Sequence, residues 1–111
     1  MAELRPSWFP EYNPAQQLIF DQITQIITRN YQQFGYTHIH TPAVEKNTTL
    51  LAKNGEETWK QIFGLYGMSQ WASDLKDYGL HFDLTVPFAR YTLDREHVLT
   101  FPFKRYQIQP V

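Results

Sequence analysis

One long amphipathic segment near the N-terminus constrains the fold more than any other feature of the sequence. Between Asn13 and Gly35 the chain reads NPAQQLIFDQITQIITRNYQQFG, and its apolar residues recur at steps of three and four, the period of a helix with one apolar face. That face comprises Leu18, Ile19, Ile23, Ile26, Ile27 and Phe34, with Asn30 as its only polar member. Asn13 is a favoured N-cap, Pro14 suits the first helical position, and Gly35 suits a left-handed stop. The sequence therefore predicts a long helix between Asn13 and Gly35.

The composition is typical of a globular protein and excludes several kinds of site. The 111 residues suffice for one domain, with 42% hydrophobic and 19% charged residues. A formal charge of −1 gives the whole chain no strong attraction to nucleic acid, which leaves open binding through a local patch. The absence of cysteine excludes disulfides, thiolate metal ligands and cysteine nucleophiles, and it favours a cytoplasmic location. No apolar run approaches the roughly 20 residues that cross a bilayer, so we expect no membrane partner.

Shorter patterned segments after the helix predict an α+β fold. Strands are expected over 37–42, 61–67, 79–85 and 103–109, and helices over 48–53 and 86–97. An irregular excursion over 68–78 separates the second and third strands. These elements predict a mainly antiparallel sheet, on which the long helix and a short helix pack. Because the last strand runs into Val111 with no partner strand after it, we interpret the chain as truncated.

Two histidines, His38 and His40, share one face of the predicted 37–42 strand. Their spacing suits two ligands of one metal ion, but no third ligand stands nearby and there is no cysteine. We therefore expect no metal site. The sequence also contains no phosphate-binding glycine loop, nucleophile elbow or dinucleotide fingerprint.

Asp83 is the side chain whose position most suggests ligand chemistry. It alternates with His81 and Thr85 along the predicted strand, just before the helix predicted over 86–97. A carboxylate beside a hydroxyl is suited to binding a substrate ammonium group. Aspartate is equally a favoured helix cap, and the residue chemistry alone favours the cap.

Four blocks, taken in order, resemble the N-terminal part of the catalytic domain of histidyl-tRNA synthetase, a class II aminoacyl-tRNA synthetase. They read LIFDQITQIITRNYQQFGYTHIHTPAVE, GEETWKQIF, DLTVPFARY and FPFKRYQIQPV. The resemblance implies that residues 1–111 form the N-terminal part of such a catalytic domain, from motif 1 to the start of motif 2. It also implies a class II synthetase-like α+β fold, here incomplete.

The resemblance assigns roles to three residues. The first block is similar to motif 1, which builds the dimer interface in the family, and its strand ends at Pro42. The DLT triplet is similar to the family's amino-acid-binding segment, which implies that Asp83 and Thr85 hold the α-ammonium group of histidine. Family members usually carry an arginine two residues before this acid. This chain has His81 there, so any salt bridge made at that position is changed or lost.

As a whole, the resemblance implies a homodimeric histidine–tRNA ligase as the full-length parent. Such an enzyme activates histidine with ATP and Mg²⁺ and transfers it to tRNA(His). The motif 2 arginine, motif 3, the histidine-specific motifs and the anticodon domain are absent from these 111 residues. We therefore assign no catalytic residue, and we expect the chain alone to be inactive and to bind neither ATP nor Mg²⁺ tightly.

Two other interpretations stay open from the sequence. The histidine-sensing regulatory subunit of ATP phosphoribosyltransferase has the same fold and charges no tRNA. A non-catalytic dimerisation module would also use the long helix and the abundant aromatic residues. The sequence of the segment DLTVPFARY is more similar to that of the synthetase.

Overall fold

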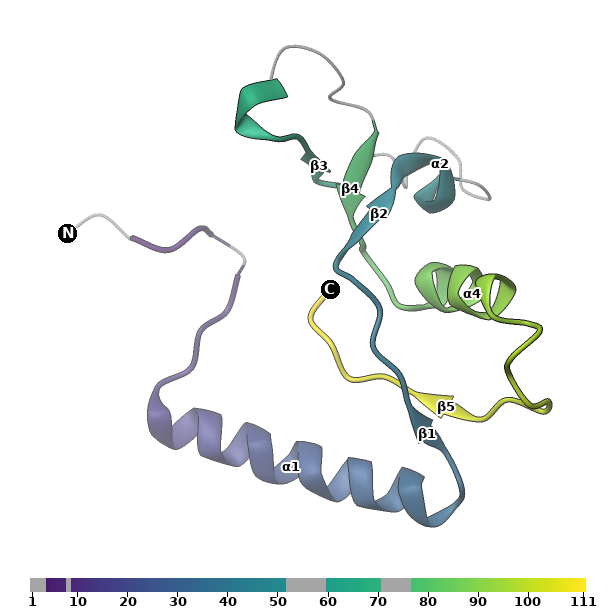
Figure 1. Cartoon of the computed structure of the whole chain (residues 1–111). Coiled ribbons are helices and arrows are strands. Elements are labelled where there is room, and N and C mark those ends of the chain that lie inside the picture. Colours follow the sequence, from purple (N-terminus) through teal and green to yellow (C-terminus); the bar gives the residue numbers. More distant parts are fainter. Residues whose placement is uncertain (1–3, 8, 52–59, 71–76) are drawn as a thin grey trace. The chain divides into compact units, whose positions relative to one another are not determined.

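The computed structural model describes residues 4–7, 9–51, 60–70 and 77–111. The chain divides into two compact units, Met1–Tyr36 and Thr37–Val111 (Figure 1). Most of the GEETWKQIF block lies outside the described residues, as does most of the excursion predicted over 68–78. No helix among the described residues is both long and apolar enough to cross a membrane.

The N-terminal unit is dominated by helix α1, Pro14–Gln33. Its start is closed by a capping box, in which the Asn13 side chain accepts from the Gln16 backbone at 2.9 Å and the Gln16 side chain accepts from the Asn13 backbone at 3.0 Å. Gly35 has a φ of +80°, the left-handed conformation that glycine adopts without strain. The predictions of the N-cap, of Pro14 as the first helical residue and of the glycine stop are confirmed. Within this unit α1 buries none of its residues.

Two small sheets form the framework of the C-terminal unit. Strands β2 (Val44–Lys46), β4 (Tyr78–Leu80) and β3 (Gly64–Leu65) form an antiparallel sheet in the order β2-β4-β3. Strands β1 (Thr37–His38) and β5 (Arg105–Tyr106) form a separate parallel pair. The prediction of a mainly antiparallel α+β fold is confirmed, and the parallel pair is an addition to it.

The strands are shorter than the sequence predicted. The clearest case is the strand expected over 79–85, because β4 ends at Leu80. One residue later, the backbone N–H of His81 still donates to Ala43 at 2.9 Å, but the chain then turns into a helix. The prediction that Asp83 and Thr85 lie on a strand face is therefore wrong. A period of two over a few residues does not distinguish a strand from an approach to a helix.

Helices α2 (Asn47–Leu50) and α4 (Thr85–Asp94) pack against each other, and a 3₁₀ turn, η1, spans Met68–Gln70. Helix α4 starts one residue before the predicted 86–97 helix. It ends at Asp94, because Arg95 leaves helical geometry with a φ of −124°. The second half of the helix predicted over 48–53 lies largely outside the described residues.

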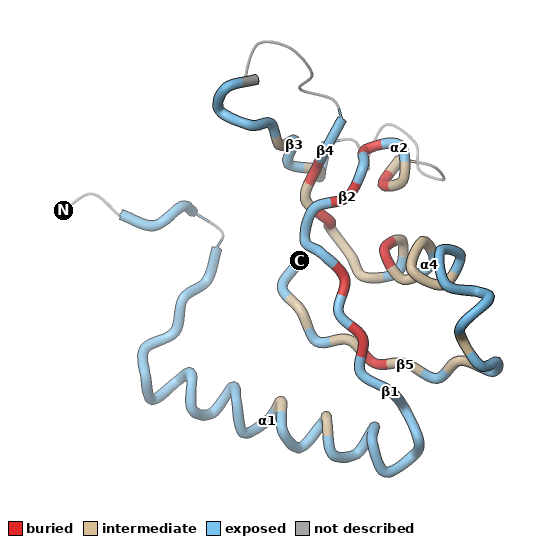
Figure 2. Tube along the Cα trace, viewed as in Figure 1, coloured by how far each residue is buried: buried red, intermediate tan, exposed pale blue. Residues whose placement is uncertain are grey.

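The buried residues of the C-terminal unit are few and largely polar. They lie on β2, β4 and the residue after it, α2, the start of α4, β5 and the segment between β1 and β2 (Figure 2). They include the apolar Ile39, Leu50 and Tyr106 and the polar Thr41, Glu45, Asn47 and His81. Aromatic contacts add to this core, since the Phe103 ring lies 6.2 Å from that of Phe88 and 6.3 Å from that of Tyr91. Polar interactions therefore contribute much of the specific packing.

We predict that Gly79→Ala lowers the free energy of unfolding by about 1–3 kcal/mol, as measured by urea denaturation. Gly79 is buried at the centre of β4, and an added Cβ would lie 2.8 Å from Ile62 Cγ2 and closer still to the Asn47 carboxamide oxygen. Asn47→Ala removes that nearest obstruction, so the alanine at position 79 should cost less in an Asn47→Ala background. An identical cost in both backgrounds would show that the contact with Asn47 is not the cause.

Candidate ligand site at the start of helix α4

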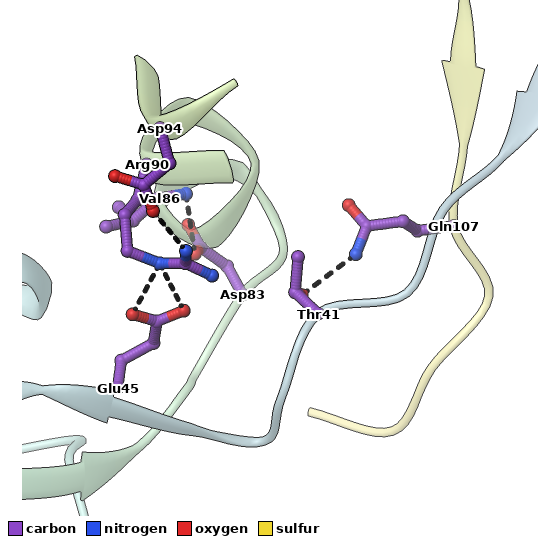
Figure 3. Close-up of polar contacts among 7 residues, drawn as sticks. All are labelled: Thr41, Glu45, Asp83, Val86, Arg90, Asp94 and Gln107. Carbon is purple, nitrogen blue, oxygen red and sulfur yellow. Dashed lines mark hydrogen bonds and ion pairs between the residues drawn. The ribbon is translucent and has the colours of Figure 1, made fainter. Parts of the chain in front are cut away.

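Asp83 lies in the short connection between β4 and α4, and it is half-buried. Its Oδ1 accepts a hydrogen bond from the backbone N–H of Val86 at 3.4 Å (Figure 3). A side-chain oxygen that accepts from the N–H three residues later is the pattern of an N-cap, here with a long bond. The N-cap position of α4 is Leu84, which makes no side-chain cap bond, so Asp83 makes a long, cap-like bond from the residue before it.

The cap leaves Asp83 with capacity for a ligand. Only Oδ1 accepts from Val86, and no second hydrogen bond or ion pair to this carboxylate occurs among the described residues. Thr85 is the first residue of α4 and is exposed. The structure thus places the predicted carboxylate and hydroxyl on either side of the start of one helix. A negative charge is also favourable there, because the helix N-terminus carries partial positive charge.

An ion pair joins the middle of this helix to strand β2. Arg90 of α4 donates from Nε to both carboxylate oxygens of Glu45, on β2, at 2.9 Å each. It donates from Nη1 to Asp94 at 2.8 Å (Figure 3). The Glu45 side chain is only 4% exposed, whereas that of Asp94 is 55% exposed. The pair with Glu45 is therefore the one that is shielded from water.

The environment of Arg90 raises its pKa. Partial burial acts to lower the pKa, but the hydrogen bonds and negative charges of Asp94 and Glu45 act in the opposite direction and prevail. A base with a raised folded-state pKa loses its stabilising contribution only when the pH rises through that value. The pair therefore holds at neutral and mildly alkaline pH.

Pro42 is exposed, and it follows the fully buried Thr41. Together with Glu45 and Arg90 it lines an open pocket of about 570 Å³. The predicted interface residue thus lies on an accessible surface beside the ion pair that positions α4.

A second polar cluster surrounds Thr41. The Gln109 carboxamide donates to the Thr41 carbonyl at 2.7 Å and accepts from the Thr41 N–H at 3.1 Å. The Gln107 carboxamide donates to the Thr41 hydroxyl at 3.0 Å (Figure 3). His81 is buried, and its Nε2 lies 2.7 Å from the Pro110 carbonyl oxygen. The C-terminal residues are thus bound to the segments that precede Pro42 and Asp83.

The two histidines considered as metal ligands make other contacts. The ring of His38 packs on that of Tyr106 at 5.1 Å, and His40 lines the pocket beside Pro42. Within the part of the chain that the structure describes, no group of three histidine, aspartate or glutamate side chains is placed to hold a metal ion.

Sequence reasoning missed the partners that organise the site. Arg90 and Asp94 stand four residues apart on a predicted helix, a visible signal for one of the two ion pairs. No local signal identifies Glu45 as the buried partner. Gln107 and Gln109 did alternate along the predicted 103–109 strand, but their burial against Thr41 depends on the tertiary fold.

We predict that Glu45→Gln lowers the free energy of unfolding by about 1–3 kcal/mol, because it leaves Arg90 partly buried without its shielded counter-charge. The matched variant Asp94→Asn removes one carboxylate charge from the same arginine. It should cost no more than about 0.5 kcal/mol, because Asp94 is exposed. Urea denaturation of both variants checks the prediction, and equal losses would contradict the dominant role of Glu45.

Comparison with known proteins agrees with the resemblance found in the sequence, although no family model matches the chain. The histidine–tRNA ligase of Xylella fastidiosa (strain M12) is 42% identical over 108 residues, which cover 91% of this chain and 23% of that protein. The histidine–tRNA ligase of Stenotrophomonas maltophilia (strain K279a) is 41% identical with the same coverage. The chain thus spans about a quarter of the length of the curated relatives it matches.

Solved structures agree in fold. The histidyl-tRNA synthetase from Nostoc sp. PCC 7120 superposes with a TM-score of 0.81 at 37% identity, over 95% of this chain and 23% of that chain. A protein from Bacillus halodurans, described as an ATP phosphoribosyltransferase regulatory subunit/histidyl-tRNA synthetase, shares the fold with a TM-score of 0.68 at 20% identity, over 93% of this chain and 27% of that chain. Over nearly all of its own length, the chain is therefore homologous to about a quarter of histidine–tRNA ligase, and it has the fold of that part of a class II aminoacyl-tRNA synthetase.

Proposed function

We propose that this chain is part of a histidine–tRNA ligase, which activates histidine with ATP and transfers it to tRNA(His). The observation that carries the proposal is the 40–42% identity to histidine–tRNA ligases over 91–96% of the chain. The match with the fold of a histidyl-tRNA synthetase supports it independently.

In this proposal, Asp83 and Thr85 bind the α-ammonium group of histidine. The carboxylate supplies a charge-assisted hydrogen bond, and the hydroxyl supplies a neutral one. Asp83 Oδ1 is occupied by the Val86 N–H, so the second oxygen is the one assigned to the ammonium group. Capping and ligand binding then use different atoms of the same side chain.

The contribution of this chain to the reaction is to position histidine. Activation requires attack of the histidine carboxylate on the ATP α-phosphate, and such steps depend on orientation and on charge neutralisation at the phosphoryl group. The described residues provide no cluster that fits Mg²⁺, so we assign no step through a metal ion to them. We expect histidine activation to require further residues of the full-length ligase.

We further propose a cytoplasmic homodimer assembled through the first block. Helix α1 has an apolar stripe whose members Leu18, Ile23 and Ile26 are each more than half exposed within this chain. Pro42, at the end of the same block, is also exposed. A second copy of the chain is the partner that the class II resemblance implies for these surfaces.

The regulatory-subunit alternative has weaker support. The Bacillus halodurans structure, whose description includes that function, is 20% identical and supports the fold alone. The relatives at about 40% identity are histidine–tRNA ligases. The dimerisation-module alternative shares the proposed interface and differs in having no role for Asp83.

We predict that Asp83→Asn, introduced into the full-length ligase that carries this sequence, raises the apparent KM for histidine about tenfold to a hundredfold, the range for a lost charged hydrogen bond. Asparagine is as good an N-cap as aspartate, so the variant can keep the oxygen that accepts from Val86, whereas the second oxygen, assigned to the ammonium group, is replaced by an NH2 group that cannot accept. The measurement is histidine-dependent ATP–pyrophosphate exchange. Thr85→Ser, which keeps the hydroxyl, is the control, and an unchanged KM in Asp83→Asn would leave Asp83 as a cap only.

We also predict that the 111-residue chain self-associates and that Ile26→Glu weakens this association at least about tenfold, because it places a charge on an apolar interface. Gln25→Glu introduces the same charge outside the apolar stripe and should have little effect. Sedimentation equilibrium measures both variants. A wild-type chain that is monomeric at all concentrations would argue against the proposed interface.

A further inference from the structure

The C-terminal segment Arg105–Pro110, called the strap below, is bound by three different kinds of hydrogen bond. At its start, backbone pairing with β1 brings the Ile39 N–H to 3.1 Å from the Tyr106 carbonyl. Beyond this backbone pair, the Gln109 side chain takes the place of a backbone partner and binds both the N–H and the C=O of Thr41. Thr41 has no exposed surface, so these bonds are shielded from competing water.

The end of the strap is held by His81. A carbonyl oxygen can only accept, so the 2.7 Å contact with Pro110 requires His81 to donate from Nε2. The backbone N–H of the same histidine donates to the carbonyl of Ala43, at 2.9 Å. One residue, only 5% exposed, therefore connects the strap to the segment that follows Pro42.

His81 is separated from Asp83 by a single residue. Two extended residues span at most about 7 Å, so the position of His81 limits where the Asp83 carboxylate can lie. On the other side of Asp83, the ion pair between Arg90 and Glu45 holds α4 to β2. Asp83 is thus fixed from both directions along the chain.

We propose that His81 is a positioning residue for histidine binding: its Nε2–H bond to Pro110 holds the strap, the Pro42 segment and the Asp83 carboxylate in one arrangement. The role of Asp83 in binding histidine rests on the proposed function, whereas the arrangement of the strap, the Pro42 segment and Asp83 does not. The resemblance implies an arginine at this position in most family members. Here one imidazole hydrogen bond connects the strap to the segment that contains Asp83.

The imidazole uses its two nitrogens differently, and this asymmetry makes the proposal testable. Nδ1 is buried and has no hydrogen-bond partner among the described residues, while Nε2 makes the bond to Pro110. A glutamine amide nitrogen reaches about as far along the side chain as Nε2, and an asparagine amide nitrogen reaches only as far as Nδ1. His81→Gln should therefore preserve the connection, whereas His81→Asn and His81→Leu should lose it.

The experiment uses nuclear magnetic resonance on the 111-residue chain without ligand, so its outcome is independent of histidine binding. In the wild-type chain, imidazole ¹⁵N shifts at neutral pH should show a proton on Nε2 of His81. In His81→Asn and His81→Leu, hydrogen exchange of the Thr41 amide should accelerate about tenfold, the effect of losing one shielded hydrogen bond. The Val86 amide shift should move in the same variants, and His81→Gln should retain wild-type values for both.

The Ile39 amide, in the β1–β5 rung, is the internal control. Its exchange should stay unchanged in every variant, because the backbone pairing does not involve His81. An unprotonated Nε2 in the wild-type chain would overturn the proposal. Equal acceleration at Ile39 and Thr41, or equal behaviour of His81→Gln and His81→Leu, would reduce His81 to a general packing role and would also overturn it.

Discussion

The buried carboxylate of Glu45 is the constraint on which the C-terminal unit depends. A carboxylate with 4% of its side chain exposed is costly unless a cation and further hydrogen bonds compensate for its lost hydration. Arg90 supplies that compensation from the middle of α4, through its Nε atom. Because the pair joins β2 to α4, it limits where the helix lies relative to that strand, and hence where the residues that begin the helix are held.

The small apolar core explains why polar contacts carry so much of the specificity. Thr41, Glu45, Asn47 and His81 are all buried, and each buried polar group must find a partner or lose the free energy of its hydration. Such requirements are directional, so they select one arrangement of strands and strap. Apolar packing alone would tolerate small shifts between these short elements.

Asp83 illustrates how one side chain serves structure and the proposed function together. Its cap bond to Val86 supports the start of α4, and the same helix start favours a negative charge at that position. A ligand ammonium group would then meet a carboxylate that is already oriented by the fold. Preorganisation of this kind lowers the entropic cost of binding, and His81 and Arg90 extend it to the flanking segments.

The sequence by itself determined the features that depend on neighbouring residues. It identified α1 with both of its ends, the α+β class, the support that Asp83 gives to the start of α4 and, through the order of its four blocks, the homology to histidine–tRNA ligase. It overestimated the lengths of the strands and placed Asp83 and Thr85 on a strand face, because short alternating patterns carry little information about strand pairing. Only the tertiary structure decided the pairing of β1 with β5, the partnership of Glu45 with Arg90 and the bond of His81 to Pro110. The partners in such contacts are far apart in the sequence: 45 positions separate Arg90 from Glu45, and 29 separate His81 from Pro110. The bond between Gln109 and Thr41 spans 68 positions. Capping and helical periodicity act within a few residues, whereas such long-range contacts form only when the whole chain satisfies its buried polar groups together.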